Sequence, residues 1–177
     1  MPLHLHDLYE RLDGYSRQVP LDDLTTWLRD LEIDPADLME YARFDPHGYQ
    51  RNLLRAGPGY HALLLCWLPG QRSPIHDHRG SSCGVRVIQG TLTETVFDRT
   101  PHGHIYPTHT GELSVGAVCG SVDADIHQIS NLHPTENLIT LHVYTPPLVR
   151  MGTYSLMHTR VEQFCDPVVT FSQGAGI

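Results

Sequence analysis

Two histidines, His76 and His78, stand two residues apart in the segment PIHDHRGSSCGVRVIQG, residues 74–90. The segment is otherwise typical of a β-strand, in which side chains i and i+2 point to the same face of the sheet. Two imidazoles side by side on one face can bind a divalent transition metal through two nitrogen atoms. The spacing therefore predicts two metal ligands, and the alternative is a pair of histidines hydrogen-bonded on the rim of a sheet.

A catalytic metal site of this kind takes three protein ligands and keeps positions open for substrates. The best candidate for the third ligand is His127, in the strand-like segment DIHQIS, downstream of a predicted turn at residues 116–120. A strand at this place could return beside the first pair in a closed barrel. Taken alone, His127 is equally well explained as an ordinary strand residue, so the residues themselves leave its role open.

From His47 onward the chain has the pattern of short strands separated by glycine and proline turns. The predicted strands are residues 49–54, 60–68, 73–78, 84–89, 91–98, 105–109, 126–131, 138–144, 154–158 and 168–172. Many short strands at this spacing predict an antiparallel barrel or sandwich, and hence a fold dominated by β-structure.

The N-terminal residues differ, because apolar side chains recur there at helical spacing. A first helix is predicted over residues 3–12, a second begins at Pro20, and a third begins at Pro35. We expect these helices, in residues 1–44, to cover one end or face of a barrel formed by residues 45–177. The two parts would make a single domain.

The composition restricts the classes of function. The chain has 177 residues, a net charge of −8 and 13 histidines. The negative charge argues against a nucleic-acid partner, and the surplus of histidine favours metal binding. The N-terminus lacks the pattern of a signal peptide, and the longest apolar run, residues 62–68, is too short to cross a membrane. Four scattered cysteines without a CxxC pair are expected to be reduced, so we expect a cytoplasmic protein.

The segment HDHRGSSCGVRVIQG resembles the first motif of the cupin barrels, in the variant carried by the cysteine dioxygenase family of thiol dioxygenases. Ordinary cupins have a metal-binding Glu a few residues after the histidine pair, where this chain has Ser81, Ser82 and Cys83. The resemblance covers about residues 49–149. It implies a cupin fold, a small antiparallel β-barrel or jelly roll with a short N-terminal helical cap. The neutral iron(II) ligands that it implies are His76, His78 and His127.

The resemblance also assigns a group of polar residues beside the metal. Cys83 matches a cysteine that forms a thioether cross-link to a tyrosine in many family members, and Tyr144 matches that tyrosine. His142 matches the histidine that hydrogen-bonds the tyrosine hydroxyl. Thr140 stands where the family often has serine, and it keeps the hydroxyl group. The resemblance thus implies a relay of three side chains that ends at Tyr144.

Arg51 matches the arginine that binds the substrate carboxylate, and Tyr49, on the same predicted strand face, is expected to contact that carboxylate too. A guanidinium grips a carboxylate through two parallel hydrogen bonds. Family members that prefer mercaptopropionate-type substrates tend to carry glutamine here, so Arg51 suggests the arginine-containing bacterial type and favours L-cysteine. Without the resemblance, a single arginine in a strand is more simply interpreted as a surface cation.

The resemblance implies a non-haem iron(II) thiol dioxygenase that converts L-cysteine and O2 to cysteine sulfinate without an organic cofactor. The alternatives are a dioxygenase for another small thiol, such as 3-mercaptopropionate, and a non-catalytic metal-binding cupin. Relatives are often monomers, so we expect a monomer with small-molecule partners and with neither a nucleic acid nor a membrane as partner.

Overall fold

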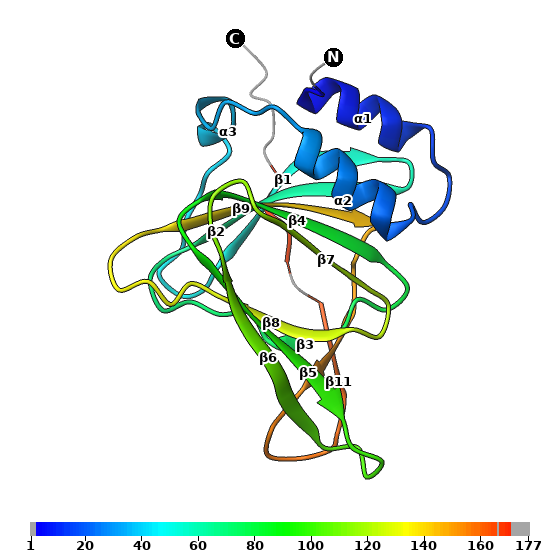
Figure 1. The fold of residues 1–177 in the computed structure, drawn as a ribbon, viewed down its shortest axis with the longest axis vertical. Helices are drawn as coiled ribbons and strands as arrows, with labels where there is room; N and C mark the ends of the chain where they lie inside the picture. The colour runs from blue at the N-terminus through cyan, green and yellow to red at the C-terminus, as the bar shows by residue number, and fades with distance from the viewer. Residues whose placement is uncertain (1–2, 166, 171–177) are drawn as a thin grey trace.

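The computed structural model describes residues 3–165 and 167–170. Within these residues the strands form two antiparallel sheets that face each other (Figure 1). The first sheet has, in spatial order, β1 (Gln50–Gly57), β2 (Tyr60–Trp67), β9 (Leu138–Thr145), β4 (Ser82–Gln89) and β7 (Val118–Val122). The second sheet has β11 (Glu162–Phe164), β10 (Met151–Tyr154), β3 (Ile75–His76), β8 (Ile126–Ser130), β5 (Leu92–Arg99) and β6 (Ile105–Leu113). This arrangement confirms the predicted fold dominated by antiparallel β-structure.

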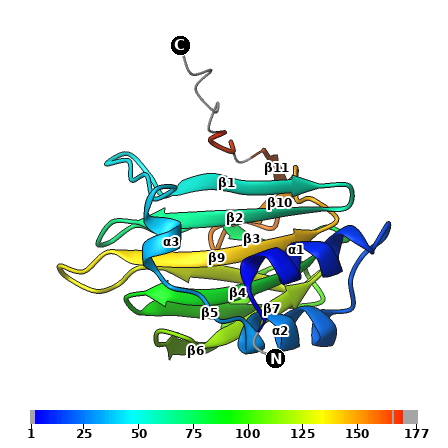
Figure 2. The same ribbon diagram turned by 90° about the horizontal axis from the view of Figure 1, so that it is seen from above.

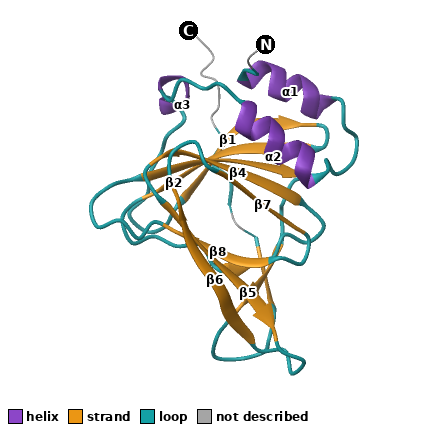
Figure 3. Ribbon diagram, viewed as in Figure 1, coloured by secondary structure: helices purple, strands orange, loops and turns teal. Residues whose placement is uncertain are grey.

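Short helices lie over the outer face of the first sheet, as Figures 2 and 3 show. In the described part of the chain they are α1 (Leu5–Asp13), α2 (Leu21–Asp30) and α3 (Ala36–Met39). The predicted helical cap is confirmed, although the first helix begins two residues later than expected and the third is a single turn. None of the described helices is long and apolar enough to span a membrane. The division of the chain at residue 44 stays a prediction.

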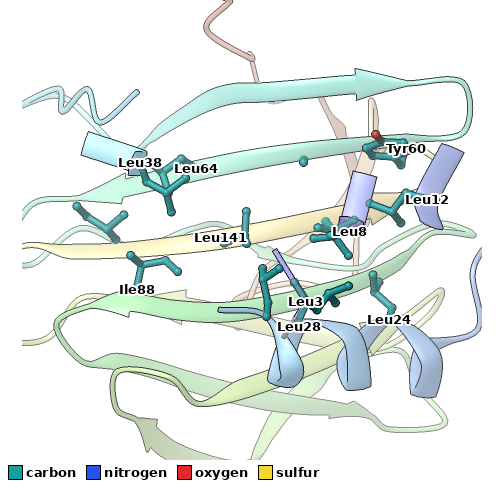
Figure 4. Packing of buried hydrophobic residues seen from close by; sticks show 14 of the residues in the cluster. Leu3, Leu8, Leu12, Leu24, Leu28, Leu38, Tyr60, Leu64, Ile88 and Leu141 are labelled. Carbon is teal, nitrogen blue, oxygen red and sulfur yellow. The ribbon is translucent and has the colours of Figure 1, made fainter. Parts of the chain in front are cut away.

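A hydrophobic cluster joins these helices to the first sheet (Figure 4). Leu8 of α1 and Leu28 of α2 are fully buried in this cluster, together with Leu64 of β2 and Leu141 of β9. Because the helices cover one face and the second sheet lies on the other, β9 is buried along its whole length. Burial on both faces explains why this central strand contains no Asp, Glu, Lys or Arg.

The two faces of β9 carry different side chains, following the two-residue period of a strand. Leu141 and Val143 belong to the cluster under the helices. Thr140, His142 and Tyr144 alternate with them and therefore point into the interior between the two sheets. The predicted relay residues thus share the inner face of one buried strand.

Helix α2 approaches β4 so closely that a side chain is excluded at Gly84. A Cβ atom at this position would lie 2.6 Å from Cδ1 of Leu28 and 2.9 Å from Cγ of Leu24. Two residues along the same strand face, Arg86 donates a hydrogen bond of 2.7 Å to the carbonyl oxygen of Leu28 and another to that of Leu31. These bonds satisfy carbonyl groups at the C-terminal end of α2. A glycine and an arginine therefore fix the helix on the sheet.

Three strands of the second sheet differ clearly from their predicted bounds, and one of them, β6, runs to Leu113 instead of ending at residue 109. The strand expected over residues 73–78 is reduced to the two residues of β3, and the chain turns just after His78, where Arg79 and Gly80 have φ values of 39° and 81°. His78 consequently lies beyond the strand, not on it. Strand β10 ends at the residue where the predicted strand 154–158 begins.

Two other strands were missed. Strand β7 occupies most of the predicted turn at residues 116–120, where it pairs with β4. Gly120 lies against α2, and a Cβ there would be only 2.8 Å from side-chain atoms of the helix. Strand β11 is exposed at every residue and so has no apolar pattern. Of the predicted strand 168–172, Val169 forms an isolated bridge, and residues 171 and 172 lie outside the described residues.

Replacing Gly84 with alanine should destabilise the protein, because the new methyl group would overlap side chains of α2. Overpacking of this kind costs about 1–3 kcal/mol in the free energy of unfolding. Urea denaturation would measure the loss. The matched control is Gly48→Ala, where no atom lies within 4 Å of the added Cβ, and the expected change is within about 0.5 kcal/mol. Equal effects of the two substitutions would contradict the close packing of α2 on β4.

Candidate active site

Three histidines converge between the sheets, in the part of the chain that the structure describes. His76 ends β3, His78 follows it in the turn, and His127 lies on β8 directly opposite His76 in the strand register. The ring centroids are 5.2 Å apart for His76 and His78, and 4.7 Å apart for each of the other pairs. One ring nitrogen of each residue lies within 4.8 Å of the other two, and all three side chains are buried. This spacing suits a single metal ion bound by three imidazoles.

Hydrogen bonds on the far edges of two rings determine which nitrogens face the centre. Nδ1 of His76 lies 2.9 Å from the carbonyl oxygen of Pro74, and Nδ1 of His127 lies 2.7 Å from Oε1 of Glu94. As both partners are acceptors, each Nδ1 carries the hydrogen and each Nε2 is left as a lone-pair donor. Both ring nitrogens of His78 are buried and have no hydrogen-bond partner among the described residues. A buried, unpartnered nitrogen beside two lone-pair donors fits a bound metal ion.

Burial keeps the rings of His76 and His78 in the form that binds metal. It lowers the pKa of His76 to about 3, with a further contribution from the neighbouring His127. Burial, followed by the same neighbour, holds the pKa of His78 well below its usual range. Both rings are therefore neutral at ordinary pH, and a neutral imidazole can donate its lone pair without first losing a proton. No carboxylate joins this cluster of ligand atoms in the described residues.

Asp77, between the first two histidines, holds their segment against β10. Its Oδ1 accepts a hydrogen bond of 2.7 Å from the backbone N–H of Gly152, and its Oδ2 accepts one of 2.7 Å from the hydroxyl of Tyr154. Asp77 is buried, with 7% of its surface exposed, so these bonds are shielded from water. They fix the backbone from which His76 and His78 project, although β3 itself is only two residues long.

The predicted relay is formed by three side chains on the inner face of β9. Oγ1 of Thr140 lies 2.9 Å from Nε2 of His142, and Nδ1 of His142 lies 3.1 Å from the hydroxyl oxygen of Tyr144. Burial, followed by the charge of Arg51, holds the pKa of His142 well below its usual range, so this ring is neutral too. The Tyr144 ring lies 6.4 Å from that of His78, centroid to centroid, which brings the end of the relay to the metal cluster.

Cys83 lies on β4 directly opposite Tyr144 in the strand register. Its Sγ is 4.0 Å from Nδ1 of His142, and only 1% of the residue is exposed. Burial raises the pKa of the Cys83 thiol to about 12, against a smaller opposing effect of a hydrogen bond with Tyr144. The thiol is therefore protonated, shielded from solvent and adjacent to the tyrosine to which the resemblance links it.

Arg51, on β1 of the first sheet, brings a positive charge into the interior across from the three histidines. It is 3% exposed, so the alternative of a surface cation is wrong. Its guanidinium carbon lies 5.4 Å from the centre of the Tyr144 ring, and its Nη2 donates a hydrogen bond of 3.4 Å to the carbonyl oxygen of Leu148. The ring of Tyr49 stacks on that of Trp67 at 4.2 Å. A buried guanidinium is a favourable partner for an anionic group.

These groups line one cavity. The sequence-predicted residues on its wall are Tyr49, Arg51, His76, His78, Cys83, His127, His142 and Tyr144. Thr140 is the one predicted residue that stands behind the wall, in contact with His142. Met151, 3% exposed, also lines the cavity as an apolar surface.

Sequence reasoning missed Glu94, Asp77 and Trp67. Glu94 lies on β5, and nothing in the segment TLTETVF marks a carboxylate that meets a histidine 33 positions later. Asp77 stands between the two predicted ligands, so the sequence shows that it is close to the site. The sequence does not show that Asp77 bonds to residues of β10. Trp67 stands within the apolar run of residues 62–68 and is easily interpreted as core; its indole N–H donates a hydrogen bond of 3.1 Å to Oγ1 of Thr140.

Comparisons with known proteins show the family to which this chain is similar. The family model described as cysteine dioxygenase type I matches residues 5–157. Cysteine dioxygenase type 1 of Danio rerio is 30% identical over 155 residues, which cover 85% of this chain and 75% of that protein. Cysteine dioxygenase type 1 of Rattus norvegicus is 33% identical over 147 residues, 81% of this chain and 71% of that protein.

Two solved structures show a likeness of fold alone. A protein from Thermus thermophilus has a TM-score of 0.54 and 22% identity, with 66% of this chain and 98% of that chain covered. An uncharacterised Klebsiella pneumoniae protein with a double-stranded β-helix domain has a TM-score of 0.53 and 17% identity, with 70% and 96% covered. Together with the family match, this likeness of fold confirms the cupin architecture expected from the sequence.

Glu94→Ala should weaken metal binding, because the carboxylate orients His127 and increases the basicity of its free nitrogen. Loss of such a partner typically lowers metal affinity about 10- to 100-fold. Competition with a chromophoric chelator would measure the affinity for Zn2+. Glu94→Gln should lose less, since its amide oxygen can still accept the hydrogen bond.

The matched control is Glu112→Gln, an exposed carboxylate on the adjacent strand β6, which should bind metal as the wild type does. Wild-type affinity in Glu94→Ala would show that the contact with His127 has no influence on the metal site.

Proposed function

The chain belongs to the cysteine dioxygenase type I family, and on that premise we propose that it is an iron(II)-dependent dioxygenase that converts L-cysteine and O2 to cysteine sulfinate. The main support for the proposal is that two sets of functional groups line the same cavity. Three buried imidazoles stand on one side, and a buried guanidinium with a tyrosine hydroxyl stands on the other.

His76, His78 and His127 would hold the ferrous ion through nitrogen atoms. Iron(II), when bound, supplies an acceptor for the substrate thiolate and the means to activate dioxygen. Because imidazole ligands carry no charge, they would not neutralise the positive charge of the ion. The site would therefore favour an anionic substrate over a neutral one. The absence of a carboxylate from the described ligand cluster supports this role.

Arg51 would bind the carboxylate of cysteine through two parallel charge-assisted hydrogen bonds. Its own hydrogen bond to the carbonyl oxygen of Leu148 orients the guanidinium before the substrate arrives. Tyr49, held by its stacking on Trp67, would contact the same carboxylate. The substrate would then span the cavity, with the thiol at the imidazoles and the carboxylate at Arg51, so binding fixes the reacting sulfur in place.

Tyr144 would act at the reacting end of the substrate through its hydroxyl group, with His142 and Thr140 fixing the direction of that group. Both atoms of O2 add to the sulfur, which reaches the sulfinic oxidation state and leaves the carbon skeleton intact. Buried residues on β9 and β4 exclude water from this end of the cavity.

We also propose a thioether between Cys83 and Tyr144. Its formation joins Sγ to a ring carbon and removes one hydrogen from each, a two-electron oxidation for which dioxygen, already a substrate here, is the oxidant. Cys83 and Tyr144 lie directly opposite each other on the paired strands β4 and β9, and this position supports the proposed thioether.

The proposed reaction should consume oxygen in proportion to cysteine when the purified protein is supplied with ferrous iron. An oxygen electrode and mass spectrometry of the product would test this, with sulfinate expected as the main product. Cysteamine should be a poor substrate, because it lacks the carboxylate that Arg51 binds. Faster turnover of 3-mercaptopropionate than of cysteine would show that cysteine is not the preferred substrate. Binding of thiols without oxygen uptake would favour a non-catalytic metal-binding protein.

Arg51→Gln should keep its metal but lose affinity for cysteine. Hydrogen bonds to charged groups contribute about 1.5–3 kcal/mol, so KM should rise about 10- to 100-fold. Steady-state oxygen uptake measures KM, and metal analysis with a thermal melt checks that the site is intact. Arg55→Gln, an exposed arginine on the same strand, is the control and should leave KM unchanged. An unaltered KM in Arg51→Gln would rule out the assigned role of Arg51.

A further inference from the structure

The Thr140–His142–Tyr144 relay extends one residue further, to Trp67 at the end of β2. The indole Nε1–H of Trp67 donates a hydrogen bond of 3.1 Å to Oγ1 of Thr140. Trp67 is 1% exposed and Thr140 is completely buried, so no bulk water competes for this contact. An indole N–H can only donate, which makes this end of the chain of hydrogen bonds unidirectional.

A count of hydrogens then fixes the next bond. The hydroxyl of Thr140 accepts from Trp67, and its own single hydrogen needs an acceptor because buried polar groups are paired. Among the described residues, its other hydrogen-bond partner is Nε2 of His142, at 2.9 Å. If Nε2 carried the hydrogen, two donors would point at Oγ1 and the hydroxyl hydrogen would have no acceptor within reach. Thr140 therefore donates to Nε2.

The same count fixes the remaining bond. His142 is neutral in its buried position, so a ring without hydrogen at Nε2 carries it at Nδ1. Nδ1 lies 3.1 Å from the hydroxyl oxygen of Tyr144 and donates to it. The phenolic oxygen is then an acceptor towards His142, and its own hydrogen is turned away from that ring, towards the side of the cavity that Cys83 also lines.

We infer that Trp67 is a positioning residue, whose indole N–H selects the Nδ1–H tautomer of His142 and so makes Tyr144 a hydrogen-bond donor to whatever occupies the cavity. The reverse direction would have Tyr144 donate to His142 and present only lone pairs to the cavity. The tautomer is a property of the resting protein. The inference rests on the proposed function only for its kinetic consequence.

Nitrogen-15 NMR of the full chain, loaded with diamagnetic Zn2+, measures the tautomer directly. The two ring nitrogens of His142, assigned by their absence in His142→Gln, should show a directly bonded hydrogen at Nδ1 and none at Nε2. A hydrogen at Nε2 in the wild-type protein would overturn the inference. This measurement needs no substitution at Trp67 and no turnover, so it stands apart from any failure of the proposed activity.

Trp67→Phe keeps an aromatic ring against Tyr49 and removes the indole donor together with some buried volume. The ratio of the Nδ1–H to the Nε2–H tautomer should fall by up to about tenfold, the factor supplied by one hydrogen bond of ordinary net strength. With cysteine and iron, kcat should fall several-fold while the metal content is unchanged. Thr140→Ser, which keeps the hydroxyl, should retain the wild-type tautomer, and Thr140→Val should lose the preference as Trp67→Phe does. A wild-type tautomer ratio in Trp67→Phe would show that the indole N–H plays no part.

Discussion

The pairing of β3 with β8 sets His76 directly opposite His127, and the rest of the cavity depends on that contact. It brings together two side chains more than fifty positions apart in the sequence, at a place where the strand carrying the first has only two residues. Hydrogen bonds of Asp77 to β10 provide the rigidity that so short a strand lacks. Once the two rings converge, the turn after β3 delivers His78, and the opposite sheet supplies Arg51 and the relay.

The three imidazoles of the site are not equivalent. His76 faces the neutral carbonyl group of Pro74, whereas His127 faces the carboxylate of Glu94. A charged acceptor makes a ring nitrogen a stronger donor than a neutral acceptor does. The three clustered imidazoles carry no negative charge, yet the carboxylate of Glu94 stands directly behind one of them. Their role as the metal ligands stays a prediction. The positive charge available to a substrate is therefore smaller than three neutral ligands alone would leave.

The sequence predicts those parts of the site that depend on local spacing. The alternation along β9 places Thr140, His142 and Tyr144 on one face whatever the strand pairs with. His127 needed the family resemblance, because no local pattern separates a ligand from an ordinary strand histidine. Glu94 and Trp67 were missed because their roles are set by strands that pair only in the folded barrel. Strands β7 and β11 were missed because a glycine and full exposure respectively erase the apolar alternation.

The two walls of the cavity differ in how firmly the fold holds them. The wall with Tyr144 and His142 belongs to a strand that is buried at every residue between helices and the other sheet. The wall with His76 is joined to β10 and then to β11, an exposed three-residue edge. Native-state openings start where few apolar contacts resist them. Metal exchange should therefore proceed by fraying of that edge, and the hydroxyl group of Tyr144 would keep its place while the ion enters or leaves.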